Sequence, residues 1–216
     1  MNAAGSRKRV LPCFVGFLIV AGVSGCVNLP ATSTLPGVSS DAEMNAPLKP
    51  SFPQPELRTP SAPRPAAMLY GQWEAVQVTD MKSVTPATKY SNTMVFTATH
   101  GYVFSDDGTC QTTTRVGDQE TTAGGKWSCD KDILTLNLGN ASGKTVTMRF
   151  KLLWYGDDQF EMRYADLEEY RKLLSVGEIR DLSCTYDDRG CMTTRMTIQG
   201  STTTMLESPL VLERKK

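Results

Sequence analysis

The stretch from Thr93 to Val116, TMVFTATHGYVFSDDGTCQTTTRV, decides the fold that the sequence predicts. Polar and apolar residues alternate in it, threonine is frequent, and Asp107-Gly108 interrupts the pattern. Alternation with a period of two is typical of a half-buried strand, and Asp-Gly is a strong signal for a tight hairpin turn. The stretch therefore predicts strands at 93–99, 101–105 and 109–116, with a hairpin at Asp107-Gly108.

The same pattern continues through residues 68–216, which we predict to form one all-β domain. One segment departs from it: Asp166 and Glu169 resemble the start of a helix, which we expect to run from Leu167 to Ser175 before Gly177 ends it. Many short strands with one short helix favour a closed barrel or a sandwich. The further predicted strands are 70–79, 125–129, 133–138, 145–155, 159–164, 179–186, 191–199, 202–207 and 210–213.

Three groups of residues carry a resemblance to a known family. Tyr70-Gly71-Gln72-Trp73 supplies a Gly-x-Trp opening, Tyr102-Val103-Phe104 leads into Asp107-Gly108, and Gly125-Lys126-Trp127 is followed by the apolar run 133–136. Together they resemble the bacterial lipocalin-like domains, over residues 70 to about 164. The resemblance implies a small antiparallel up-and-down barrel whose interior holds one small apolar ligand, and it brings no catalytic residue.

The expected ligand-binding residues are the large aromatic side chains Trp73, Phe104, Trp127 and Trp154. Flat rings suit an irregular apolar guest, and the helix could cover one mouth of the barrel. The same rings could instead fill the core. In that case the barrel would be an interaction module for another envelope protein, such as a hydrolase that it inhibits or a complex that it helps to assemble. Small periplasmic protease-inhibitor barrels share the Gly-x-Trp opening.

The first 25 residues are predicted to be an export signal. A basic cluster at residues 7–9 precedes an apolar run that is too short to span a membrane comfortably, and the run ends in Val23-Ser24-Gly25-Cys26. This ending resembles the lipobox of bacterial lipoproteins, which implies that Cys26 is acylated and anchors the protein to a membrane. Val27 stands where an aspartate would favour the inner membrane, so we expect attachment to the outer membrane.

Residues 26–67 are predicted to be the lipidated cysteine followed by a disordered, Pro-rich linker. Most of the chain's 12 prolines lie there, with many Ser, Thr and Ala residues. Proline at this density disfavours regular structure, so the segment is interpreted as a spacer between the bilayer and the domain. A docking site for a proline-binding groove, or contact with the cell wall, is the alternative.

Four cysteines remain in the domain after Cys13 leaves with the signal and Cys26 takes lipid. In an oxidising compartment an even number favours disulfides, and three pairings are possible. We predict Cys110 with Cys129 and Cys184 with Cys191, each pair across a hairpin. The close Cys-x-x-Cys spacing of zinc or redox sites is absent.

Several functional classes are disfavoured by composition. The chain has 23 basic and 23 acidic residues and a single histidine, which argues against nucleic-acid binding and His-rich metal sites. Paired aspartates at 106–107, 157–158 and 187–188 coincide with predicted turns. His100 is expected to be an exposed turn residue. We therefore predict a binding protein rather than an enzyme, with no cofactor, no metal and no catalytic residue.

Overall fold

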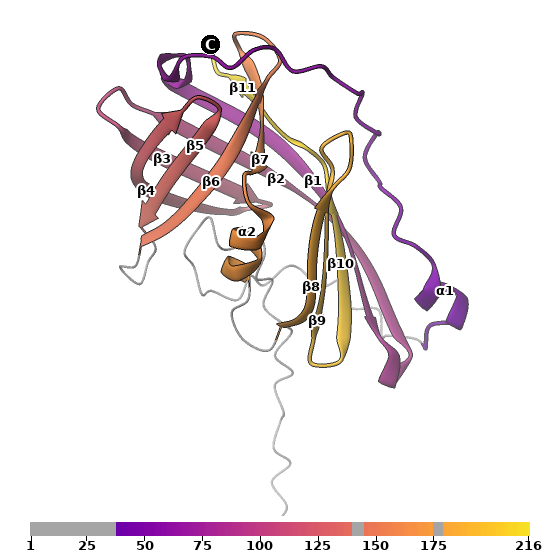
Figure 1. Ribbon diagram of the computed structural model, residues 1–216. Coiled ribbons are helices and arrows are strands. Elements are labelled where there is room, and N and C mark those ends of the chain that lie inside the picture. The colour runs from indigo at the N-terminus through magenta and orange to yellow at the C-terminus, as the bar shows by residue number, and fades with distance from the viewer. Residues whose placement is uncertain (1–37, 140–144, 175–178) are drawn as a thin grey trace, which may run out of the picture.

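The computed structural model describes residues 38–139, 145–174 and 179–216. It is an all-β protein with a closed eight-stranded antiparallel barrel and one short helix beside the barrel, which confirms the predicted fold class (Figure 1). The predicted export signal, Cys26 and residues 27–37 lie outside the described residues.

Most strands match the sequence prediction within a residue or two, and three differ: β1 continues six residues beyond the predicted end at 79, β4 begins six residues before the predicted start at 125, and β2 joins two predicted strands. The strands expected at 93–99 and 101–105 form one continuous strand that passes through His100 and Gly101. The bounds are β1 Gly71–Thr85, β2 Tyr90–Phe104, β3 Thr109–Val116, β4 Gln119–Asp130, β5 Ile133–Gly139, β6 Thr145–Trp154, β7 Gln159–Tyr164, β8 Ile179–Tyr186, β9 Met192–Ile198, β10 Ser201–Glu207 and β11 Leu210–Arg214. The helices are α1 Asp41–Asn45 and α2 Leu167–Leu174, with short 3-10 turns η1 Ala66–Leu69 and η2 Pro86–Thr88.

The barrel is an up-and-down meander closed by the last strand. Strands β1 to β7 each pair with the next, and β11 pairs with both β7 and β1. Asp107 forms the expected turn, because its Oδ1 accepts hydrogen bonds from the Thr109 amide at 2.8 Å and hydroxyl at 2.6 Å. Alternation fixes the inner face: Leu134, Leu136 and Leu138 of β5 are all buried.

A second sheet grows from the same long hairpin. Strands β1 and β2 have 15 residues each, which is roughly 50 Å of strand and more than a small barrel needs. Beyond the barrel, residues 79–84 of β1 pair with residues 202–207 of β10, which continues into β9 and β8. The segment between β7 and β11 therefore forms a sheet that stands beside the barrel (Figure 1).

Helix α2 starts as the sequence predicts. The Asp166 carboxylate accepts hydrogen bonds from the amides of Glu168 at 2.8 Å and Glu169 at 3.3 Å, which caps the first turn. Tyr170 and Leu174 are buried against β8 and β9. The helix lies at one end of the barrel, opposite the end where the chain terminates (Figure 1). The expected stop at Gly177 falls outside the described residues.

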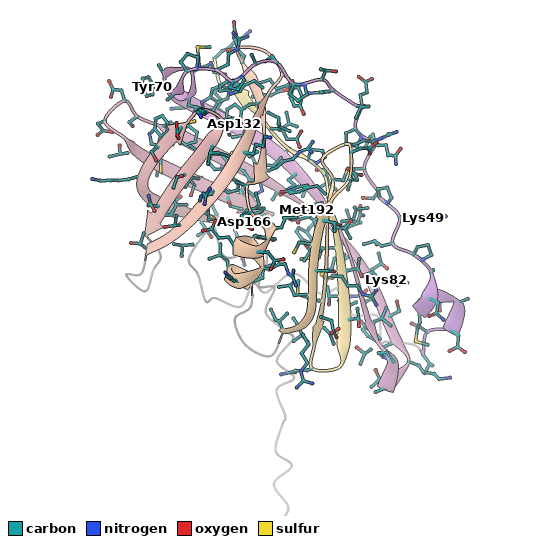
Figure 2. The ribbon with its side chains drawn as sticks, viewed as in Figure 1. Lys49, Tyr70, Lys82, Asp132, Asp166 and Met192 are labelled. Carbon is teal, nitrogen blue, oxygen red and sulfur yellow. The ribbon has the colours of Figure 1, made fainter. Side chains whose placement is uncertain are left out.

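Residues 38–65, which we call the strap, lie along the domain. Lys82 Nζ donates hydrogen bonds to the carbonyls of Glu43 at 2.6 Å and Ala46 at 2.5 Å, next to α1. Further along, the Ser51 amide donates to Asp80 Oδ2 at 2.8 Å. Figures 1 and 2 show the strap running from α1, past the labelled Lys49, to the top of the barrel. This part of the predicted linker therefore contacts β1.

The predicted disulfides are wrong: none of the four domain cysteines lies at disulfide distance from another. In the β3–β4 hairpin Cys110 faces Gly125, and Cys129 lies four residues further along the strand, about 13 Å away. In the β8–β9 hairpin Cys184 faces Thr194. Cys191 lies three residues before Thr194, just ahead of β9, and so is not the residue opposite Cys184. Sequence symmetry about a turn did not reveal the register.

Candidate functional site

The aromatic residues predicted to bind ligand pack together in the barrel. Trp73 contacts Trp154 with ring centroids 6.1 Å apart, and Phe104 contacts Trp127 at 5.2 Å. Trp73, Phe104 and Trp154 are each 1% exposed. The structure thus brings all four residues into one cluster with Phe160 and the leucines of β5. Their own rings occupy the space that the sequence assigned to a guest.

This end of the barrel, the Trp end, is closed by the chain that enters it. The Trp73 indole Nε1 donates a hydrogen bond to the Leu69 carbonyl at 2.6 Å, and Leu69 in η1 is fully buried. The Arg214 guanidinium lies over the Trp73 ring at 4.3 Å and donates to the Tyr70 carbonyl at 2.7 Å. Tyr70 in turn contacts Trp127 edge-on. These contacts cover the Trp end of the barrel.

A small cavity lies at the other end, where α2 and the second sheet meet the barrel. Its volume is about 50 Å³. Figure 2 labels Met192 at this junction, where β9 begins. Its polar lining consists of Gln77, Ser208, four tyrosines and two further ionisable side chains. The last six are Tyr102, Tyr164, Tyr170, Tyr186, His100 and Glu207.

Glu207 is the central feature of this cavity. It ends β10 on the same sheet face as Met205, and its side chain is 7% exposed. Its Oε2 atom is buried and accepts no hydrogen bond from the described residues. The directly opposite residue on β1, Thr79, is fully buried and its hydroxyl is equally unpartnered. Burial raises the pKa of Glu207 to about 7.

Three tyrosines bring aromatic surface and hydroxyl groups close to Glu207. The rings of Tyr164 and Tyr170 stack with centroids 3.9 Å apart, which ties α2 to β7. The Tyr186 hydroxyl accepts a hydrogen bond from the Tyr164 amide at 3.0 Å. Burial raises the pKa of each of these hydroxyls, so all three stay protonated at neutral pH.

His100 corrects the sequence prediction of an exposed turn residue. It lies inside β2 and is 5% exposed, with Nδ1 3.2 Å from the Thr114 hydroxyl. The error arose because His100 was predicted to lie between two strands, 93–99 and 101–105, whereas β2 runs through it. Burial lowers the pKa of His100 to about 4. The imidazole is therefore neutral at pH 7 and gives the cavity no positive charge.

Arg163, the arginine of β7, is paired with a carboxylate other than that of Glu207. Arg163 Nε donates to Glu161 Oε1 at 2.5 Å, and the Tyr155 hydroxyl donates to Glu161 Oε2 at 2.6 Å. Glu161 is 2% exposed, so this is a buried, partnered acid. The turn at Gly190, with φ of +85°, sits directly on this pair. Glu161 is satisfied structurally, in contrast to Glu207.

The described part of the chain contains neither a cluster of metal-ligating side chains nor a helix that could cross a membrane. Within residues 38–139, 145–174 and 179–216, no group of three or more His, Cys, Asp or Glu side chains is arranged to hold a metal ion. No helix in those same ranges is both long and apolar enough to cross a bilayer.

The sequence analysis did not identify Glu207 as a site residue. A signal was available, because Glu207 keeps the alternation of the inward-facing Met205 on β10 and so occupies a core position. Nothing in the sequence indicated that Tyr170 of α2 would stack on Tyr164 at the end of β7. The position of Glu207 in the cavity depends on the pairing of β10 with β1.

Comparison with known proteins identifies no family. No protein-family model matches the chain, and no curated protein matches it. Among solved structures, a redesigned β-barrel matches at 13% identity over 70% of this chain and 95% of its own, with a TM-score of 0.30. The protein Rv2717c from M. tuberculosis matches at 17% identity over 69% of this chain and 94% of its own, with a TM-score of 0.33.

Proposed function

We propose that this chain is a lipid-anchored protein of the bacterial envelope whose β-barrel binds a small ligand in the Glu207 cavity. The observation that carries the proposal is a buried carboxyl oxygen without a hydrogen-bond partner in an enclosed, tyrosine-lined space. Buried polar atoms are almost always paired, so an orphaned one points to a missing partner. We propose action by binding rather than by catalysis.

The anchoring part of the proposal is supported by the sequence. The basic cluster, the apolar run and Val23-Ser24-Gly25-Cys26 occur in the order that a lipoprotein signal requires. Acyl chains on Cys26 would hold the protein on a membrane without a transmembrane helix. The outer membrane is the proposed location because Val27 follows the cysteine.

The size and position of the cavity favour a ligand other than the apolar guest suggested by the lipocalin-like resemblance. A cavity of 50 Å³ holds about four water molecules, far below the ~300 Å³ or more of a typical ligand pocket. A guest among Trp73, Phe104, Trp127 and Trp154 would have to displace rings that already contact each other. A compact head group at the α2 end requires no such rearrangement.

The second candidate is the interaction module, and the filled Trp end favours it. If the barrel serves only as a rigid scaffold, its outer surface or loops would contact another envelope protein.

Native mass spectrometry of the full-length chain, solubilised from bacterial membranes, tests both functions. A mass increase from acylation that Cys26→Ala abolishes supports the anchor, and a stoichiometric small passenger supports the binding protein. An acylated chain without a passenger, which also takes up none of a panel of small charged and neutral molecules, would favour the interaction module.

A further inference from the structure

The cavity presents a negative group that the protein itself does not neutralise. Among the described residues no cation acts on Glu207, since burial alone accounts for its raised pKa. His100 is neutral at pH 7, and Arg163 is held by Glu161. Leaving a carboxylate buried without a partner is costly, and an external cation would remove that cost.

We propose that the cavity binds a compact organic cation, an alkylammonium group, with the Glu207 carboxylate as its counter-ion and the tyrosine rings as its walls. This assignment rests on the proposed function and specifies its ligand class. Aromatic rings attract weakly hydrated cations electrostatically, and Tyr164, Tyr170 and Tyr186, from three different elements, line the cavity together with Glu207.

Other ligand classes fit the cavity less well. An anion such as a phosphate or a fatty-acid carboxylate would be repelled by Glu207. A neutral apolar group would leave the buried Glu207 carboxyl oxygen without a partner. A hard metal cation prefers about six oxygen ligands, whereas Met162, Met192 and Phe150 supply apolar surface. An ammonium group can donate to the carboxylate while its carbon atoms contact the rings.

The size of the cavity limits the cation. Space for about four waters corresponds to a head group of roughly four heavy atoms. Propylammonium has four heavy atoms, and 1-propanol is its neutral counterpart of the same length. Gln77, Ser208 and Leu210 are partly exposed and mark the side of the cavity nearest to solvent.

Binding should depend on pH through Glu207 alone between pH 5.5 and 8. With a pKa of about 7, the carboxyl is mostly ionised at pH 8 and about 3% ionised at pH 5.5, which predicts roughly thirtyfold weaker cation binding at the lower pH. The other ionisable groups facing it do not change charge in this range, because burial keeps each neutral: His100 on β2, Tyr102 on β2, Tyr164 on β7, Tyr170 on α2, and Cys184 and Tyr186 on β8.

The test is isothermal titration calorimetry on the full-length chain in detergent, with propylammonium, 1-propanol and propionate as probes. We expect propylammonium to bind at pH 8, to bind roughly thirtyfold more weakly at pH 5.5, and to outcompete both other probes. Equal binding of propanol and propylammonium would overturn the cation assignment while leaving a ligand site in the cavity. A chain that binds no probe at either pH would overturn the proposed binding function of the cavity as well.

Variants separate the charge from the packing. Glu207→Gln keeps the shape of the side chain and should abolish propylammonium binding, whereas Glu120→Gln removes an exposed carboxylate on the β3–β4 hairpin and should leave binding unchanged. Tyr170→Phe keeps the ring and should retain most of the affinity. Unchanged binding by Glu207→Gln, with folding confirmed by circular dichroism, would overturn the proposal. The pH dependence of the unaltered chain tests it independently of any variant.

Discussion

Replacing Glu207 by glutamine should change how stability depends on pH. Below pH 4.5 the carboxyl is protonated in both the folded and unfolded chain, so its ionisation has no effect on stability. As the pH rises, the Glu207 carboxyl ionises first in the unfolded chain, whereas in the folded protein, where its pKa is about 7, it keeps its proton to higher pH. The difference from the ordinary value of 4.5 corresponds to about 3 kcal/mol. That amount of stability is lost between pH 4.5 and 7, and the glutamine variant keeps it.

The assay is urea unfolding of both proteins at matched pH values from 4.5 to 8. His100 has the opposite slope, because its lowered pKa means that the stability from its neutral form is lost as pH falls from 6.5 to about 4. Both proteins contain His100, so this contribution cancels in their difference. We expect Glu207→Gln to gain about 3 kcal/mol over the unaltered protein across this range. A difference that stays constant with pH would refute the buried, unpartnered carboxylate.

Three further predictions concern the scaffold. Gly125→Ala should destabilise the barrel by about 1–3 kcal/mol, because a Cβ there meets the Asn137 carbonyl on the neighbouring strand β5. Gly139→Ala is the control, because a Cβ there makes only an ordinary contact. The urea midpoints of the two variants should differ, and equal midpoints would contradict the register of β4 and β5. Lys82→Met removes the hydrogen bonds to α1, which should weaken the attachment of the strap by about 1.5–3 kcal/mol and expose residues 38–50 to limited proteolysis. An unchanged cleavage pattern would show that the strap does not depend on Lys82. The four domain cysteines should all react as free thiols in denaturant without reductant: Cys110, Cys129, Cys184 and Cys191. In the native protein they should react slowly, because burial raises the pKa of each thiol. A chain that loses four hydrogens on oxidation would show that these cysteines form two disulfides.

The sequence was sufficient for the barrel because local pattern determines most of it. The boundaries of β3, β7 and β8 agree with the alternation and turn signals, and Asp166 caps α2 as expected. Register was harder, since the cysteine positions could not show that Cys184 faces Thr194. The second sheet could not be foreseen either, because it requires β10 to pair with the outer half of β1, more than a hundred residues away.

The candidate site was missed for the same reason. Glu207 reaches the cavity only because β10 pairs with β1, and Tyr170 only because α2 packs over β7. Each residue alone looks ordinary: a glutamate near a strand end and a tyrosine on a helix. The contacts of the strap, such as Lys82 with the carbonyls beside α1, join a Pro-rich segment to side chains far along the chain, and composition carries no signal for them.

The contrast between the two buried glutamates argues that Glu207 serves a ligand rather than the fold. Glu161 is 2% exposed and accepts hydrogen bonds from Arg163 and Tyr155, so its charge is compensated, and the turn at Gly190 lies against it. Glu207 is equally removed from water, yet its Oε2 is unpartnered and it costs about 3 kcal/mol at neutral pH. A structural role would be met as well by an uncharged side chain of the same size. The carboxylate becomes favourable only when a cation enters the cavity, because the cation then recovers the cost of burying the charge.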